Sequence, residues 1–566
     1  MRQLDTAQIE ALKLQGNSAE DWNNILVGAN FSTHNIHNCH FRGCVEIEGE
    51  VVLHNSTISN YHICQGAKVI SVTSLECRHY TTFGNGVEVY AVNDNEGRSV
   101  AIHSALTAQT AYIEAMYRHR KDLIGTLKSQ TAAYAESVGS TMGNIGRNSQ
   151  IVGAKFIREV NVGNNVTIDG ASLLENGTLL DGAHIGIDVI ATDFIAAENS
   201  TIDRGTTVGH CFVGENVILS NNFSAHHSLF FAGSQLENGE ASAIFAGPYT
   251  VSFHKSSLLI AGLFSFFNAG SGTNQSNHLF KSGAIHQSVH RRGCKFASNG
   301  YVMSPAAEGE FTLVMGRHTK HHDTQLFPFS YLLERGGIST LLPGYGLRSY
   351  GTVRDVTKWP QRDKRTVKRD NINYEEFNPL LAYKAIKAIE TLNTLLEQQG
   401  DGEVLHYNNT QIKPAMAKRG IALYELYITA AIGQMLQDGE AEPTFGAWAD
   451  VAGQFVACQY LETLLDNFTT TENLVAQLND FAHNYTNHAH GWAMGALARR
   501  LGKTPTTEEV EKAVNDGKEA LTALRKMTDA DRDSEFGLAM RVGYGVDSNE
   551  QQTIDADFSA VHGLDV

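Results

Sequence analysis

Residues 162–185 contain a repeat with a period of six residues. Four consecutive hexads begin with an aliphatic residue, Val162, Ile168, Leu174 and Leu180, and each of these is followed by a glycine or an acidic residue. Amphipathic helices place apolar residues every three or four positions and half-buried strands every two, so neither pattern explains a spacing of six. The repeat predicts a parallel β-helix, in which three hexads make one roughly triangular turn and successive turns pair about 4.8 Å apart.

The repeat resembles the left-handed β-helix of the hexapeptide-repeat proteins, the trimeric LpxA-like superfamily. The consensus of that family is an aliphatic residue, then Gly, Ala, Glu or Asp, two free positions, and a small residue or Val. Sugar-nucleotide acyltransferases, serine acetyltransferases and γ-class carbonic anhydrases share this coil. The resemblance implies a left-handed coil and a homotrimer in which flat faces pair around a threefold axis.

Changes in spacing divide the chain into six segments. Apolar residues recur every six positions, then every three or four, then every six again, and every three or four towards the C-terminus. We therefore predict a mixed fold, a parallel β-helix with a helical insertion, followed by an all-α helical-bundle domain of about six helices, and the resemblance implies that the β-helix is left-handed. One step, from Val208 to Val213, is five residues, and we interpret it as a loop or bulge that interrupts the coil. The predicted segments are an N-terminal helix at 1–24, a first β-helical block at 25–100, the helical insertion at 101–139, the main β-helix at 140–345, a basic linker at 346–374 and the all-α domain at 375–566.

Composition excludes several classes of partner. The net charge is −17, and the acidic excess lies beyond residue 370, which disfavours direct binding of that region to nucleic acid or to an anionic membrane. No apolar run approaches the roughly 18–20 residues of a membrane span, and the first residues lack the character of a signal peptide, so we expect no membrane insertion and a cytoplasmic location. The seven cysteines are scattered without a C-x-x-C spacing, which indicates neither a disulfide framework nor a thiolate zinc site.

Polar residues gather between about 253 and 323, where the hexad pattern degrades. Stacked turns align residues about eighteen apart, so these groups are expected to converge on one face. Imidazoles that meet amides and guanidinium groups suit acyl transfer, because His removes a proton from an amine or hydroxyl while Asn or backbone donors hold the oxyanion. We predict His278, His290, His318, Asn268 and Asn274 as catalytic groups, and Arg291, Arg292, Arg317 and Lys320 as anchors for an anionic substrate.

Each of these features has a structural alternative. Asn and His at coil corners often only satisfy backbone groups. The group His318-x-x-His321-His322-Asp323 suggests a metal, but neighbouring residues of a strand point to opposite faces, so we assign no metal ligand. The basic run within 346–370 is either a solvated linker that contacts the acidic domain or a lid that binds phosphate.

The segments GPYTVSFHKSSLLIAGLFSFFNAGSGTNQSNH, VMGRHTKHHDTQLFPFSYL and PGYGLRSYGTVRD, between about 247 and 365, resemble an uncharacterised bacterial family sometimes labelled as related to UDP-N-acetylglucosamine pyrophosphorylase. That label implies no reaction here, because the chain lacks the nucleotide-binding motifs of the catalytic half. The expected function is acyl transfer to a sugar nucleotide or a similar small anionic acceptor, with the cofactor left open and acyl-CoA as one candidate donor. The alternatives are a non-catalytic β-helical scaffold whose acidic helical domain binds a protein partner, and a metal site like that of γ-carbonic anhydrases.

Overall fold

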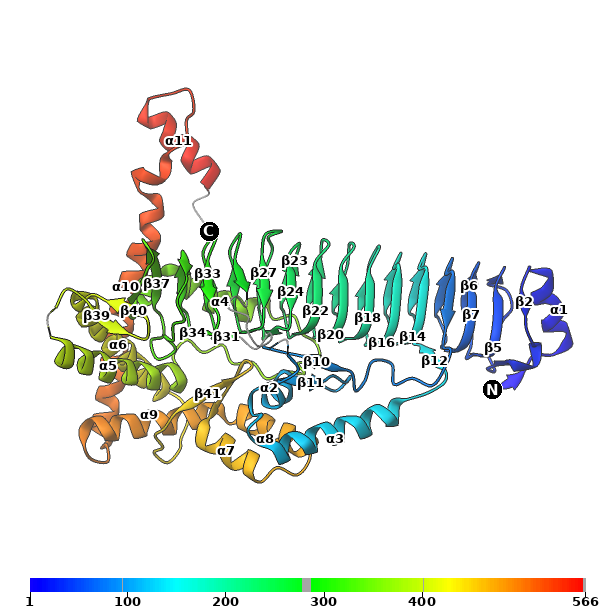
Figure 1. The fold of residues 1–566 in the computed structure, drawn as a ribbon, viewed down its shortest axis with the longest axis horizontal. Helices are drawn as coiled ribbons and strands as arrows, with labels where there is room; N and C mark the ends of the chain where they lie inside the picture. Colours follow the sequence, from blue (N-terminus) through cyan, green and yellow to red (C-terminus); the bar gives the residue numbers. More distant parts are fainter. Residues whose placement is uncertain (94, 277–286, 401, 563–566) are drawn as a thin grey trace.

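The computed structural model describes residues 1–93, 95–276, 287–400 and 402–562, and its main feature is a long parallel β-solenoid (Figure 1). The coil begins at β3 (Ile25–Val27) and ends at β37 (Tyr331–Arg335). Except at its two ends, its strands pair in parallel with strands one turn away, so the predicted β-helix is confirmed. The interior is filled by a continuous stack of aliphatic and aromatic side chains.

The regular part of the coil has a turn of 17 residues. Ile168 lies beside Ile185, and Leu174 lies beside Ala191, in the strand register. The three sides of a turn span six, six and five residues, so Leu179 occupies the buried column that the hexad count gives to Leu180. The step from 208 to 213 is therefore the short side present in each regular turn, and the interpretation as an interruption is wrong.

Corner residues with positive φ make this geometry repeat. Asn176, Asp193, His210 and His227 each adopt a φ between 45° and 53°, one per turn. Asn and Asp tolerate this left-handed conformation better than other non-glycine residues, which explains their frequency in the coil.

A long excursion leaves the coil after β9 (Ser74–Glu76) and returns at β12 (Gly143–Ile145), which stacks directly on β7 (Thr57–Ile63). It is helical in part, as expected, with two helices, and it also contains an antiparallel hairpin. The excursion therefore covers 77–142, whereas the change of spacing places it at 101–139, because a hairpin and a coil strand have the same local pattern. Its elements are β10 (Glu88–Tyr90), β11 (Ser99–Ala101), α2 (Ala108–Met116) and α3 (Lys121–Val138).

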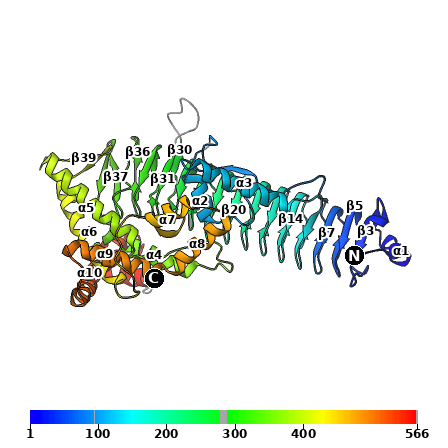
Figure 2. The same ribbon diagram turned by 90° about the horizontal axis from the view of Figure 1, so that it is seen from below.

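This excursion covers one outer face of the coil (Figure 2). Ile195, Phe212 and Leu229 follow one another at intervals of one turn and point outward, yet all three are fully buried. The hairpin and α2 supply the apolar residues that cover them. An outward apolar column of this kind has to be covered by another part of the chain or by a partner.

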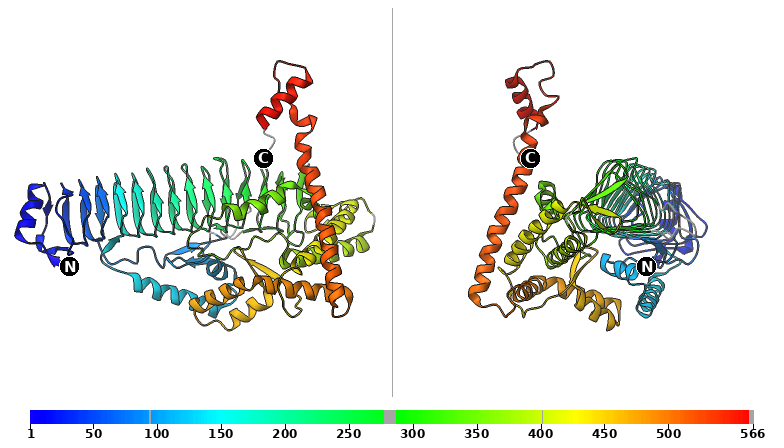
Figure 3. Two further views of the ribbon diagram at one scale, coloured as in Figure 1. Left: turned by 180° about the vertical axis from the view of Figure 1, so that it is seen from behind. Right: turned by 60° about the vertical axis from the view of Figure 1, so that its left-hand side comes forward.

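The C-terminal region is mainly helical and lies against the last turns of the coil (Figure 3). It also contains two hairpins, so residues 375–566 are not entirely α-helical. One of them, β39 (Leu405–Tyr407) and β40 (Thr410–Ile412), joins the end of the coil by pairing with β38 (Ile338–Leu342). The helices are α4 (Tyr350–Arg362), α5 (Pro379–Gln399), α6 (Pro414–Met435), α7 (Cys458–Asp466), α8 (Thr471–His483), α9 (Tyr485–Leu501), α10 (Thr507–Asp533) and α11 (Gln551–His562), and the second hairpin is β41 (Trp448–Val451) with β42 (Gln454–Ala457).

Both ends of the coil are closed by other elements. At the N-terminal end, β1 (Arg2–Gln3) pairs antiparallel with β3, and α1 (Thr6–Leu14) lies beyond it. Such caps remove the free strand edges through which solenoids would otherwise aggregate. Among the described helices, none is both long enough and apolar enough to cross a bilayer.

Candidate functional site

Two predicted catalytic histidines lie inside the coil. The register places His290 between Phe264 and Glu308 in one interior column, and it places His318 beside Val302 in another. Both imidazoles are fully buried. A substrate therefore reaches neither ring in this structure.

Glu308 holds this interior cluster together. Its carboxylate oxygens bind Nδ1 of His290 and, at 2.6 Å, Nε2 of His322. Burial alone would raise the pKa of Glu308, but the two imidazoles outweigh burial and lower it to about 2. His318 donates or accepts a hydrogen bond of 2.7 Å with Ser339, and burial together with nearby His322 lowers the pKa of His318 to about 4. The cluster is thus an anion between imidazoles in an apolar environment.

Arg292 joins the coil to the C-terminal region. Its Nε donates to Asp450 at 2.9 Å, and its two Nη atoms donate to the carbonyl oxygens of Asn373 and Gly453. The guanidinium also lies 3.8 Å from the ring centre of Phe266. These contacts occupy its donors, so Arg292 anchors a domain contact where the sequence suggests an anion anchor.

Arg291 lines a small cavity at the same contact, between the coil, α2 and β41. One Nη donates to Gln325 at 2.9 Å, while Nε is buried without a hydrogen-bond partner. Tyr112, Glu310 and Asp450 also line this cavity. With an enclosed space of only about 20 Å³, the cavity holds about one water molecule, not a substrate.

The other predicted residues do not share a face. Asn268 is exposed on the sheet that contains β29 (Asn268–Ala269), whereas the half-buried Asn274 and the exposed Arg317 belong to the other large sheet. Lys320 is exposed near β39 and β40. His278 lies outside the described residues. The structure therefore does not bring the eight described candidates together.

A wide groove lies elsewhere, between the coil and α4. Its volume is about 930 Å³, within the range of small-molecule sites. One wall is the outward column Thr201, Ile218, Gln235 and Val251, in which each residue is one turn from the next. Asn268 is the next residue of this column, so one predicted site residue adjoins the groove.

The other wall carries positive charge. Lys358, Arg362 and Lys364 line the groove and form no ion pair with any described residue. Burial lowers the pKa of Lys358, and the nearby charges of Arg362 and Arg354 lower it further. The basic run at 346–370 indicated the positive charge of this wall. The sequence did not predict that the run lies over the coil.

Several contacts hold α4 and the segment after it on the coil. Lys295 forms an ion pair with Asp355, and Trp359 packs edge-on against Phe266, with ring centres 4.5 Å apart. Asn199 donates to Thr366 at 3.0 Å. These contacts lie along the length of the wall, so the groove is a built feature of the fold.

Comparison with known proteins assigns the chain to a family. The fold defines a parallel β-solenoid protein with a helical C-terminal region. A family model described as "Domain of unknown function (DUF4954)" matches residues 44–396, and a second, "Domain of unknown function (DUF6819)", matches residues 430–565. The chain belongs to the DUF4954 family. The first match contains both walls of the groove.

A curated relative comes from Treponema pallidum (strain Nichols) and is described as an uncharacterised protein. It is 24% identical over 462 residues, which are 70% of this chain and 62% of the relative. The chain thus spans less than two thirds of the length of that protein.

Proposed function

We propose that the protein binds a small anionic ligand of the sugar-nucleotide class in the α4 groove. The observation that carries this proposal is the position of Lys358, Arg362 and Lys364, three unpaired cations that face a polar wall across a groove of about 930 Å³. Like charges held close together repel one another, and a bound anion removes this repulsion.

The wall of the coil suits the uncharged part of such a ligand. Thr201, Asn216 and Gln235 offer hydroxyl and amide groups, which donate and accept hydrogen bonds as sugar hydroxyls require. Ile218 and Val251 alternate with them and supply apolar contact. The ligand would therefore place its phosphates towards α4 and its sugar towards the coil.

The groove offers no evident base for acyl transfer. Among its described lining residues there is no His or Cys, and its carboxylate, Asp363, is bound to Arg365 at 2.9 Å. His290 and His318 are enclosed within the coil. We therefore propose ligand binding only. Acyl transfer, which the hexapeptide-repeat resemblance implies, is tested separately with acetyl-CoA.

The left-handed sense of the coil and a homotrimer are also proposals. The left-handed sense is supported by the similarity of the coil to that of the hexapeptide-repeat proteins, since its turns have three sides and many Asn residues at the corners. For the trimer, the column of Ile195, Phe212 and Leu229 is already covered within the chain. A threefold assembly would have to use the other faces, and light scattering of the full chain tests it.

Titration calorimetry and thermal shift with UDP-N-acetylglucosamine, UDP, inorganic phosphate and acetyl-CoA test the binding proposal. A ligand at 100 times its dissociation constant adds about 2.7 kcal/mol to stability. The triple variant Lys358→Gln, Arg362→Gln, Lys364→Gln should weaken binding by at least about tenfold. Arg500→Gln, which removes a cation of α9 that lies outside the groove, is the matched control. Equal binding by the triple variant and the wild type would refute the proposal, whereas acyl transfer from acetyl-CoA would extend it.

A further inference from the structure

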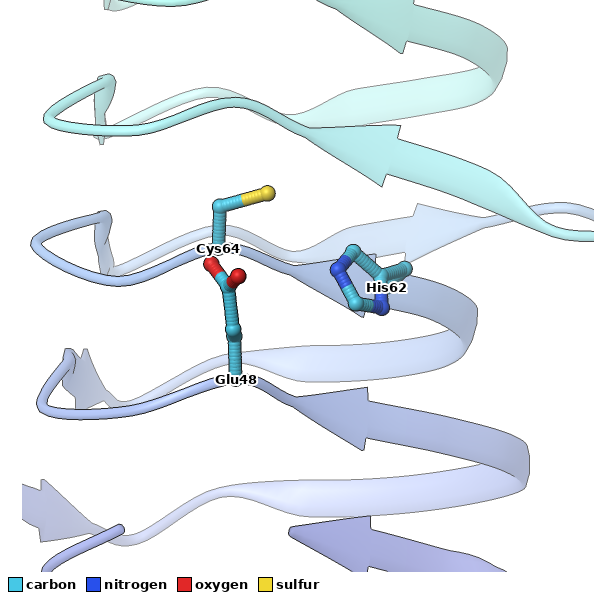
Figure 4. Close-up of side chains that lie close together, drawn as sticks. All are labelled: Glu48, His62 and Cys64. Atoms are coloured by element: carbon cyan, nitrogen blue, oxygen red, sulfur yellow. The ribbon is translucent and has the colours of Figure 1, made fainter. Parts of the chain in front are cut away.

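Three side chains with metal-binding atoms meet on the outside of the first coil block, far from the groove (Figure 4). Glu48 directly follows β5 (His40–Ile47), and Cys64 directly follows β7 (Thr57–Ile63), which is the next turn. His62 lies two residues before Cys64, so both project from the same side of the strand. Their ligand atoms lie within 4.8 Å of one another, and no other group of this kind occurs in the described part of the chain.

A neighbouring carboxylate orients the histidine. Glu46 is the strand partner of His62, and its Oε2 lies 2.9 Å from Nδ1 of the imidazole. The other ring nitrogen, Nε2, lies on the ring edge that faces Glu48 and Cys64 (Figure 4). Histidine ligands of metal ions typically bind a carboxylate through the nitrogen that does not touch the metal, because this contact fixes the ring and its tautomer.

We propose that Glu48, His62 and Cys64 form a binding site for a divalent ion of the zinc type. A set of one oxygen, one nitrogen and one sulfur atom suits zinc, whereas calcium and magnesium take oxygen ligands. Zinc holds such ligands at about 2.0–2.3 Å, and three protein ligands leave one tetrahedral position for water or another molecule. Binding therefore draws the three side chains closer together than they lie in the free protein.

Arg147 competes with the ion for Glu48. Its Nη2 lies 2.7 Å from Oε1 of Glu48, but 58% of the Arg147 side chain is exposed. Exposed ion pairs contribute little to stability, so a metal ion displaces this contact at little cost. Arg147 thus lowers the affinity of the site for the metal ion, and substitution of Arg147 should raise it.

Titration of the reduced protein with Co²⁺ tests the site, because a cysteine thiolate on cobalt gives a charge-transfer band that is independent of any activity. We expect the band to appear with one equivalent and to disappear when Zn²⁺ is added. Cys64→Ser should abolish it, and His62→Gln should weaken binding by more than tenfold. Glu46→Gln removes the carboxylate that orients the imidazole and should weaken binding by about 10–100-fold. Arg147→Gln should bind more tightly than the wild type.

Cys44→Ser is the matched control, since Cys44 is a half-buried cysteine of the same coil block that lies outside the group. It should leave the band unchanged. A band that persists in Cys64→Ser, or that is lost equally in Cys44→Ser, would overturn the proposal, as would the absence of any band. If Cys64→Ser does not fold, as judged by its thermal melt, tighter binding by Arg147→Gln decides for the site and unchanged binding decides against it.

Discussion

The carboxylate of Glu308 inside the coil makes the sharpest stability prediction. Its pKa falls from an ordinary 4.5 to about 2 because the imidazoles of His290 and His322 outweigh the effect of burial. At about 1.4 kcal/mol per pH unit, this difference corresponds to roughly 3 kcal/mol of folding free energy at pH 7. Glu308→Gln, which keeps the shape but removes the charge, should therefore cost about 3 kcal/mol at pH 7. Glu308→Ala also leaves both imidazoles without their partner and should cost about 3–5 kcal/mol.

The pH dependence follows from the sign of the pKa change. A carboxyl group whose pKa is depressed in the folded state stabilises the fold above its unfolded pKa, and this stability is lost as the pH falls through the folded value. The difference between wild type and Glu308→Gln should thus be complete above pH 5, shrink below about pH 4.5 and nearly vanish by about pH 2.

Urea unfolding followed by circular dichroism at several pH values measures both effects. Glu240→Gln is the control, because Glu240 is an exposed carboxylate on the outer side of β24 (Glu240–Ser242) and its substitution should change stability by less than about 0.5 kcal/mol. A loss below 1 kcal/mol for Glu308→Gln at pH 7, or a difference that does not change with pH, would refute the argument that a paired anion lies in the core.

Three further predictions concern contacts between the parts of the chain. Burial outweighs the attraction of Glu310 and lowers the pKa of Lys384 to about 8. Between pH 8 and about 10.5 the unfolded chain therefore binds more protons than the folded chain, so the free energy of unfolding should rise with pH. Urea unfolding should show this rise in the wild type but not in Lys384→Gln. Gly517→Ala should lower the melting temperature, since an added Cβ would lie 2.6 Å from the Cα of Gly433 where α10 crosses α6; an unchanged melting temperature would mean that the helices do not meet this closely. Phe212→Ala should cost about 3–5 kcal/mol and speed proteolysis of 77–142, because this ring lies under the excursion; uniform proteolysis would contradict that contact.

The coil was predictable because its packing repeats. An aliphatic residue that returns at a constant interval records a buried column, as Ile151, Ile168 and Ile185 do, although their interval of 17 residues is one fewer than three hexads predict. The exact turn was harder, because Leu179 and Leu180 are both aliphatic and only the register shows that the first points inward. The limits of the excursion were missed because β10 and β11 have the alternation of a coil strand.

The predicted catalytic cluster depended on a register that the sequence does not contain. Phe264 and His290 are neighbours across one turn although 26 positions separate them in the chain, so a period of 17 or 18 cannot place His290 in the interior. Glu308 was overlooked for the same reason, since an isolated Glu in a polar stretch is ordinarily on the surface. Two histidines and a carboxylate that meet in the interior would have indicated a buried cluster. The sequence does not show that they meet, because this requires knowing which residues form the interior columns.

The charges at the end of the coil explain why the coil and the helical region form one unit. Arg292 of the coil requires Asp450 of the helical region, and Glu310 of the coil binds Lys384 of α5 at 2.6 Å. Removing either partner leaves a buried charge uncompensated, which costs about 3–5 kcal/mol. The first family match ends within α5 and so includes Lys384 as well as most of the coil. Because α4 connects these two parts and forms a wall of the groove, a movement of the helical region that shifts α4 would change the width of the groove. Ligand binding in the groove should therefore strengthen the contact between coil and helices, and a weakened contact should lower affinity for the ligand.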